Sequence, residues 1–427
     1  MKNNTAPARG MRDLLPGQVE RRDHAQSVIL KAYDCFGYRR VETPALEHID
    51  LLCSGEGGDN EKLIYKVLKR GDKLDLASAT RADDLVDFGL RYDLTVPLAR
   101  FYAEHAGELP SPFRSIQIGS VWRAERPQRG RFRQFTQCDI DVLGEASILA
   151  EIELIRATVS ALTELGLKGF VVRLNDRRLL NAFIAGCGFS DERIGEVFIT
   201  IDKLDKIGLD GVAEELLSKQ HPGEAVEAAM EVLTCMAEGR RDDALRCWRS
   251  RMDLDAEGQE VERGLFQIAD IAGRSLPEGS ALEIDPTLVR GMGYYTGAIF
   301  EVVMKGYPFA MAGGGRYDKM IGRISGREVP ACGFSIGFER VVMVLEEQGI
   351  VPTRERRHIA LLYGTDAELG SLMEEASALR SQGCSVTTVL RRKKMGKQLD
   401  ELQAQGFDGF GVLDSETPVN VRSFSDE

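Results

Sequence analysis

The chain lacks any apolar run long enough to cross a membrane, because none of its stretches approaches 18 consecutive apolar residues. Its first ten residues, MKNNTAPARG, contain no apolar segment of the kind that precedes a secretory cleavage site. We therefore expect no membrane span and no signal peptide, and we interpret residues 1–10 as a disordered lead.

Closely spaced metal ligands are also missing. The eight cysteines include no C-x-x-C pair, and the chain has only five histidines. A zinc site needs Cys or His ligands at short spacing, so we predict no metal site in the protein. Scattered cysteines without a disulfide pattern are typical of free thiols in a reducing compartment, and we predict a cytoplasmic location.

Positive charge is in deficit, with 55 Lys and Arg against 67 Asp and Glu and a net charge of −12. This balance argues against general nucleic-acid binding. Two local basic stretches remain. One runs from Arg123 to Arg133 and holds five arginines, and the other is RRKKMGK at 391–397. Either stretch is a candidate for phosphate contacts, although a solvated charged surface is the more common role of such a run.

Periodicity predicts an α+β fold in which helices interrupt a mainly antiparallel sheet and a separate α/β unit follows. A helix is expected from Pro16 to just before Gly37, and another at the stretch SIGFERVVMVLEEQG. The predicted division is a lead at 1–10, a main domain at 11–177 and 277–350, a helical insertion at 178–276, a linker at 351–357 and a small α/β domain at 358–427.

A hairpin carries the first basic stretch. FRSIQIGSVWRAE forms its first arm, FRQFTQCDIDVLG its second, and RPQRGR the loop between them. Residues two apart share one face of a strand. Along one face of the second arm the side chains are therefore, in order, guanidinium groups, an aromatic ring, an amide and carboxylates. The members of this face are Arg131, Arg133, Phe135, Gln137, Asp139 and Asp141. Phosphates, a flat base and an ammonium or imidazole group are the partners that such side chains bind.

Three other stretches supply polar groups that would complete such a site. LRYDLT places Asp93 and Thr95 at a strand end, and LVRGMGYYTG offers Arg290 before Tyr294 and Tyr295. The stretches AGGGRYD and CGFSIGFER contain glycines that allow the backbone to approach a ligand closely. Neither G-x-x-x-x-G-K-[ST] nor a strand–helix G-x-G-x-x-G occurs, so the chain has no P-loop or Rossmann nucleotide site.

Six stretches, with a seventh near the start of the chain, together resemble one family. RVETPALE, the hairpin and GFSIGFER are similar to motifs 1, 2 and 3 of class II aminoacyl-tRNA synthetases. LRYDLTVP, LVRGMGYYTG and AGGGRYD resemble the peptides of the histidyl-tRNA synthetase family, as does RGMRDLLP near the start. The resemblance covers nearly the whole chain and implies a class II catalytic domain with a helical insertion and a small anticodon-binding-like α/β domain. It also implies histidine–tRNA ligase activity and a homodimer built on motif 1.

The resemblance assigns the ATP-binding residues. It implies that Arg123 binds the α-phosphate and the carboxylate of the amino acid, and that Glu125 contacts the adenine edge. It implies that Phe135 and Arg340 flank the adenine, with Arg340 also reaching the γ-phosphate. Arg290 would stabilise the α-phosphate during attack, in place of a metal ion there, while Mg²⁺ stays on the outer phosphates.

The resemblance also assigns the groups that bind histidine and tRNA. The histidine-binding residues are Asp93, Thr95, Arg123, Gln137, Asp141, Tyr294 and Tyr295. Of these, Asp93, Thr95 and Gln137 would hold the α-ammonium, and Asp141 and Tyr295 the imidazole. The tRNA acceptor end would meet Arg126 and Gln128, and the 391–397 stretch would face the anticodon arm.

Two departures from the family pattern and three alternative functions accompany these expectations. The family peptide commonly reads Leu-Asp where this chain has Met292-Gly293, and a last helix usual in the anticodon-binding domain is missing after VNVRSFSDE. One alternative is the histidine-sensing regulatory subunit of ATP phosphoribosyltransferase. The others are a paralogue that activates histidine for a non-tRNA acceptor, and a tRNA-binding protein without catalysis.

Overall fold

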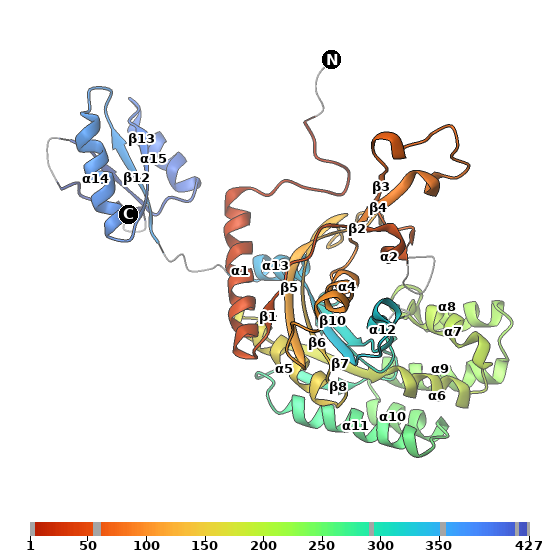
Figure 1. Ribbon diagram of the computed structural model, residues 1–427. Helices are drawn as coiled ribbons and strands as arrows, with labels where there is room; N and C mark the ends of the chain where they lie inside the picture. Colours follow the sequence, from red (N-terminus) through yellow and green to blue (C-terminus); the bar gives the residue numbers. More distant parts are fainter. Residues whose placement is uncertain (1–4, 54–60, 290–293, 351–355, 415–417, 425–427) are drawn as a thin grey trace. The chain divides into compact units, whose positions relative to one another are not determined.

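The computed structural model describes residues 5–53, 61–289, 294–350, 356–414 and 418–424 (Figure 1). The chain divides into two compact units. Residues 1–14 and 22–350 form the first unit, and residues 15–21 and 351–427 form the second. Among the described residues, no helix is both long and apolar enough to span a bilayer.

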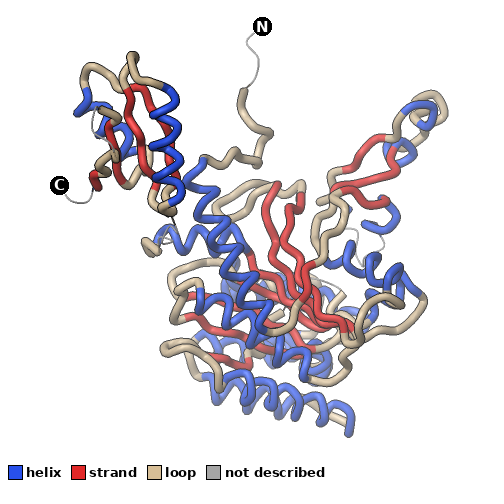
Figure 2. The backbone as a smooth tube through the Cα atoms, turned by 60° about the vertical axis from the view of Figure 1, so that its left-hand side comes forward, coloured by secondary structure: helices blue, strands red, loops and turns tan. Residues whose placement is uncertain are grey.

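The first unit is built on an eight-stranded sheet, whose strands are drawn red in Figure 2. In spatial order the strands are β1 (Arg39–Arg40), β5 (Phe113–Trp122), β6 (Gln134–Leu143), β11 (Ala331–Gly337), β10 (Ala312–Arg316), β9 (Ala298–Met304), β7 (Phe170–Asp176) and β8 (Ala281–Ile284). All neighbours are antiparallel except the two edge pairs, β1 with β5 and β7 with β8. The predicted hairpin is confirmed as β5 and β6, with Gln117 opposite Asp139.

Helices cover this sheet where their apolar side chains meet it. Helix α1 (Pro16–Cys35) begins with proline at its first position and ends just before Gly37, as predicted, and its Ile29 and Tyr33 are fully buried. Helices α5 (Leu149–Glu164) and α13 (Phe338–Glu347) contact β6 and β11. Their buried residues belong to the same apolar cluster as those of the sheet.

A smaller group of elements lies beside the sheet. Strands β2 (Leu46–His48), β4 (Val86–Leu90) and β3 (Lys66–Leu68) form a three-stranded sheet, with α2 (Ile49–Cys53) against it. Helix α4 (Thr95–His105) follows β4 and packs against α12 (Lys319–Ser325). The turn between β4 and α4 and the end of β10 therefore come from neighbouring parts of the fold.

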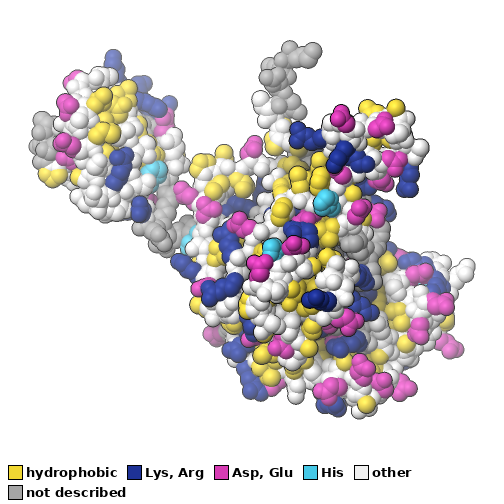
Figure 3. All heavy atoms as spheres, viewed as in Figure 1, with side chains coloured by type: hydrophobic (Ala, Val, Ile, Leu, Met, Phe, Trp, Pro, Cys, Tyr) yellow, Lys and Arg dark blue, Asp and Glu magenta, His cyan; other side chains and the backbone are white. Residues whose placement is uncertain are grey.

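Helices fill the chain between β7 and β8. They are α6 (Arg177–Gly186), α7 (Ile194–Ile201), α8 (Leu204–Ser218), α9 (Gly223–Ala237), α10 (Arg241–Arg251) and α11 (Ala256–Gly273). Trp248 is fully buried, and the apolar side chains of these helices continue the cluster of the main sheet. On the face of the first unit that Figure 3 shows, Lys and Arg side chains are interspersed with Asp and Glu.

The second unit has a four-stranded sheet in the order β13-β12-β14-β15. Its elements are β12 (His358–Tyr363), α14 (Leu369–Ser381), β13 (Ser385–Leu390), α15 (Met395–Ala404), β14 (Gly409–Val412) and β15 (Arg422–Ser423). Strand β12 is parallel to β13 and β14, whereas β15 is antiparallel to β14. The predicted α+β fold class with a small C-terminal α/β domain is confirmed.

Two local predictions are wrong. The helix expected from Ser335 starts only at Phe338, because residues 331–337 pair with both β6 and β10. Asp93 and Thr95 do not lie at a strand end, because β4 ends at Leu90 and Thr95 is the first residue of α4. At residues 331–337 long-range pairing decides the structure, which local periodicity does not report.

Candidate active site

Strand β6 presents two faces of different chemistry. Thr136 binds α1 and α13 through Arg22 and Glu339, and Cys138 and Ile140 pack into the apolar cluster. The opposite face carries Gln137, Asp139 and Asp141, as the alternation in the sequence predicted. Arg131 and Arg133 precede the strand, so they do not belong to the face that was assigned to them.

Three buried carboxylates gather next to this face. Asp139 and Asp141 are 3% and 2% exposed, and Asp93 in the β4–α4 turn is 2% exposed. None of the three forms an ion pair with a residue that the structure describes. Isolated buried carboxylates are costly, so this group needs protons or a cationic partner.

The pKa values of all three carboxyl groups are raised. Burial is the main cause at Asp93, where hydrogen bonds from the backbone and the charge of Arg123 act in the opposite direction. Burial and the neighbouring Asp141 raise the pKa of Asp139 well above its usual range. Burial raises the pKa of Asp141 to about 7, with a further contribution from the charge of Asp93 and an opposing one from the Tyr317 hydroxyl. The three groups therefore sense one another's charge.

Gln137 is held from one side only. Its Nε2 donates to Ser335 Oγ at 3.1 Å and to Asp139 Oδ2 at 3.4 Å. The Ser335 hydroxyl in turn donates to Asp139 Oδ1. The Oε1 of Gln137 is buried and has no hydrogen-bond partner among the described residues. Sequence reasoning placed Asp139 on this polar face without a role of its own and did not single out Ser335, which lies opposite Asp139 on β11.

Asp141 is fixed by a tyrosine that sequence reasoning did not assign. The hydroxyl of Tyr317 donates to Asp141 Oδ1 at 2.5 Å, while Oδ2 is buried without a partner among the described residues. Gly333 lies opposite Asp141 on β11, and a Cβ there would overlap Oδ1. This glycine leaves room for the Asp141 side chain.

Aromatic rings surround the carboxylates. The ring centroids of Tyr294 and Tyr295 are 4.7 Å apart, and those of Tyr294 and Tyr317 are 6.1 Å apart. Burial, with the charges of nearby groups including Asp93 and Asp139, raises the pKa of Tyr294 well above its usual range. A Cβ at Gly315 would come within 2.9 Å of the Tyr295 ring, so the AGGGRYD glycines make room for this ring as well.

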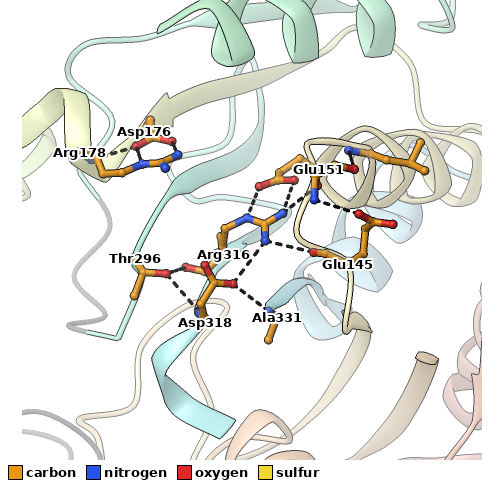
Figure 4. A network of polar contacts seen from close by, with 10 residues as sticks. Glu145, Glu151, Asp176, Arg178, Thr296, Arg316, Asp318 and Ala331 are labelled. Carbon is orange, nitrogen blue, oxygen red and sulfur yellow. Dashed lines mark hydrogen bonds and ion pairs between the residues drawn. The ribbon is translucent and has the colours of Figure 1, made fainter. Parts of the chain in front are cut away.

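Figure 4 shows a network of polar contacts centred on Arg316, the residue before Tyr317 in the sequence. Arg316 binds both carboxylate oxygens of the buried Glu151 on α5, at 2.6 and 2.7 Å. Thr296 donates to the carbonyl of Arg316, and Asp318 Oδ1 accepts from the amide of Ala331. The desolvation of Arg316 would lower its pKa, but the hydrogen bond and charge of Glu151 outweigh it and raise the pKa. These contacts hold β10, the residues after Tyr295 and the start of β11 in one arrangement.

A second region beside the carboxylates combines guanidinium groups with rings. Arg123 lies with its Cζ 5.1 Å from the centre of the Phe135 ring, and its Nε donates to the carbonyl of Tyr92. Arg340 lies in the first turn of α13, with its Cζ 5.5 Å from the centre of the Phe309 ring. Such pairs offer positive charge and flat surfaces to a phosphorylated aromatic ligand.

The loop between β5 and β6 is exposed and basic. Arg126 and Gln128 are both exposed, and Gln128 forms a β-bridge with Arg131. Glu125 and Arg131 form an ion pair at 3.5 Å, so part of the positive charge of this stretch is balanced within the loop. Arg290, the remaining predicted catalytic group, lies outside the described residues, as does Gly293.

Glu339 ties the N-terminal segment to the site strands and was missed by sequence reasoning. Its carboxylate accepts from Arg22 at 2.7 and 2.8 Å, from Arg12, and from the amide of Thr136. Burial would raise the pKa of Glu339, but the hydrogen bonds and charge of Arg22 outweigh it and lower the pKa. The residue next to Glu339 in sequence is Arg340, so this contact fixes the start of α13.

Known proteins resemble the chain over nearly its full length. A family model described as Histidyl-tRNA synthetase matches residues 10–341. A histidine–tRNA ligase of Leifsonia xyli is 46% identical, with 98% of this chain and 97% of that protein covered. Another from Christiangramia forsetii is 33% identical, with 98% and 93% covered.

Solved structures share the fold. The crystal structure of histidyl-tRNA synthetase from Nostoc sp. PCC 7120 has a TM-score of 0.79 at 24% identity and covers 100% of this chain and 96% of that one. A Bacillus halodurans protein, described as an ATP phosphoribosyltransferase regulatory subunit/histidyl-tRNA synthetase, has a TM-score of 0.73 at 21% identity, with 94% and 97% covered.

Proposed function

The chain belongs to the histidyl-tRNA synthetase family of aminoacyl-tRNA ligases, and we propose that it activates histidine with ATP and transfers it to tRNA(His). The observation that carries this proposal is a set of buried acceptor oxygens on Asp93, Gln137 and Asp141 that have no hydrogen-bond partner among the described residues. Acceptors alone suit a ligand that supplies donors. A free amino acid with an ammonium group and an imidazole N–H supplies donors at two separate points.

We assign the two ends of histidine to different members of this set. Asp93, Thr95 and Gln137 would hold the α-ammonium, while Asp141 and Tyr295 would bind the imidazole, beside Tyr294. The Tyr317 hydroxyl occupies one oxygen of Asp141 and leaves the other for a donor. A bound cation or N–H donor would stabilise the ionised form of Asp141 and so lower the pKa that burial raises.

ATP would lie along the guanidinium and ring groups. Arg123 would bind the α-phosphate and the histidine carboxylate, and Phe135 and Arg340 would flank the adenine, whose edge Glu125 would contact. Arg340 would also reach the γ-phosphate. Fixed guanidinium groups suit this chemistry, because they meet the charge that develops on the phosphate without reorganisation.

The first step needs no general base, since the histidine carboxylate is already ionised. One carboxylate oxygen attacks the α-phosphorus, the bond to the bridging oxygen breaks, and pyrophosphate leaves with histidyl-adenylate remaining. Arg123 and Arg290 would stabilise the charge on the α-phosphate. Among the residues that the structure describes, no three His, Cys, Asp or Glu side chains are grouped to hold a metal ion. Mg²⁺ would arrive with the substrate, carried by the outer phosphates of ATP.

The second step transfers the histidyl group to the 3′-terminal ribose of tRNA(His), with AMP leaving. Arg126 and Gln128 in the exposed β5–β6 loop would meet the acceptor end. The basic residues 391–397 would contact the anticodon arm through phosphates, although Arg391 and Arg392 already form ion pairs with Asp414 and Glu401.

We further propose that the protein works as a homodimer in the cytoplasm. Motif 1, residues 40–47, starts at the end of β1, an edge strand of the main sheet, and runs into β2 of the three-stranded sheet. All eight cysteines are free thiols, in keeping with a reducing compartment. The molar mass in solution, measured by light scattering at several concentrations, tests the dimer.

Histidine-dependent ATP–pyrophosphate exchange tests the first step, with the other amino acids as controls. Exchange with histidine alone, followed by histidine charging of tRNA(His), is the expected result. Histidine binding without exchange would favour the regulatory-subunit alternative. Exchange without tRNA charging would favour a paralogue with another acceptor, and tRNA binding with neither would overturn the enzymatic assignment.

A further inference from the structure

Asp139 has no place in the scheme above, although it is buried between Gln137 and Ser335. On β11 it lies opposite Ser335, and on β5 opposite Gln117. The Nε2 of Gln117 is bound to the carbonyl of Leu94 at 2.9 Å, so this amide directs its donor elsewhere. Asp139 therefore faces the Ser335 hydroxyl and the Gln137 amide.

The direction of the hydrogen bonds in this group follows from its chemistry. Ser335 has one hydroxyl hydrogen, which it donates to Asp139 Oδ1. Its oxygen is then left to accept, and Gln137 Nε2 is the donor that reaches it at 3.1 Å. The same Nε2 points at Asp139 Oδ2. With its NH₂ group committed on this side, the Gln137 amide must turn its oxygen the other way.

The structure assigns Asp139 as a positioning residue that fixes the polarity of the Gln137 amide, so that Gln137 presents an oxygen to the ligand's ammonium group. This inference rests on the proposed function, because it concerns the same histidine site. The fixed orientation of the Gln137 amide would make the site selective for a ligand with an ammonium group. An amide free to turn would offer its NH₂ group to an ammonium, two donors would face each other, and the cation would be rejected.

Asp139→Asn tests this assignment while keeping the size of the side chain. Asparagine offers an NH₂ group of its own, so the Gln137 amide is no longer held in one orientation. We expect the KM for histidine in pyrophosphate exchange to rise about tenfold or more, as for loss of one bond to a charged group. The KM for ATP should stay within about twofold, since the ATP groups are untouched, and the circular dichroism spectrum should be unchanged.

Two competing ligands distinguish a change in the orientation of the Gln137 amide from nonspecific damage to the histidine site. Histidinol carries the ammonium group, and imidazolepropionate carries the imidazole and carboxylate without it. In Asp139→Asn, the inhibition constant of histidinol should rise about tenfold, and that of imidazolepropionate should change by less than about threefold. Equal losses for both ligands, or no loss for either, would overturn the assignment.

A rescue variant gives a readout that damage to the fold would not produce. In the double variant Asp139→Asn with Gln137→Glu, the introduced asparagine donates to one oxygen of the introduced glutamate, whose other oxygen faces the ammonium. We expect this variant to recover at least about half of the loss in histidine KM on a logarithmic scale, whereas Gln137→Glu alone places two carboxylates together and should weaken binding. A double variant no better than Asp139→Asn contradicts the inference. The proposed function itself fails only if the unaltered protein shows no histidine-dependent exchange.

Discussion

Tyr317→Phe removes one hydroxyl from the interior of the site and leaves the ring in place. The hydroxyl donates to Asp141 at 2.5 Å, and Asp141 is 2% exposed, so water cannot easily replace the lost partner. A hydrogen bond to a charged, buried group contributes about 1.5–3 kcal/mol. We therefore expect kcat/KM for histidine to fall about 10-fold to 100-fold, with the KM for ATP unchanged.

The same variant should alter the pH profile. Burial raises the pKa of Asp141 to about 7, and the Tyr317 hydroxyl partly offsets this rise. Without the hydroxyl the pKa rises further, so the acid limb of kcat/KM for histidine moves to higher pH. Histidine's own imidazole titrates in this range too, but the ratio of variant to unaltered protein at each pH cancels its contribution.

Pyrophosphate exchange between pH 5.5 and 9 measures both effects. Tyr38→Phe is the matched control, because the Tyr38 hydroxyl is buried without a partner among the described residues. It should leave kcat/KM for histidine unchanged. An unmoved acid limb in Tyr317→Phe, or equal losses toward ATP and histidine, would refute the role given to the hydroxyl.

Three further predictions concern neighbouring contacts. Glu339→Gln breaks the buried ion pair with Arg22, so the free energy of unfolding of the first unit should fall by about 3–5 kcal/mol. A urea titration followed by tryptophan fluorescence measures this change, because both tryptophans lie in this unit. Gly333→Ala forces Asp141 to move and should raise the KM for histidine about tenfold, whereas Gly107→Ala, with nothing within 4 Å of its Cβ, should not. The pKa of Asp141 is higher in the folded state than in the unfolded state, so the folded protein holds an extra proton between about pH 4 and 7. The free energy of unfolding, measured relative to that of Asp141→Asn, should therefore fall as pH rises through this window, by roughly 4 kcal/mol at most. A urea series at pH 5 and 8 that shows the same difference between the two proteins would contradict this.

Sequence alone predicted the features that depend on neighbouring residues. The alternation along residues 134–141 gave both the strand β6 and its polar face, since side chains two apart share a face. Pro16 and Gly37 bounded α1 correctly for the same local reason. The roles of individual residues came from the family resemblance, because hydrophobic periodicity carries no information about them.

Sequence reasoning failed where the partner lies far along the chain. Tyr317 and Asp141 are 176 residues apart, and Arg22 and Glu339 are 317 apart. Neither pair belongs to a local pattern, so only the assembled sheet brings its members together. The same holds for Ser335, whose strand pairing with Asp139 replaced the helix that its local sequence suggested.

The order of strands in the sheet has a consequence for synthesis of the chain on the ribosome. The β5–β6 hairpin is local and can close early, but β11 joins β6 only after the helices between β7 and β8 have been made. Until then Asp139 and Asp141 face water and are ionised at neutral pH. Burial in the complete sheet raises the pKa values of Asp139 and Asp141, so these two side chains on β6 should take up protons when β11 closes the sheet. A binding site prepared for a cation thus makes the closing of the sheet in the new chain an equilibrium that depends on pH.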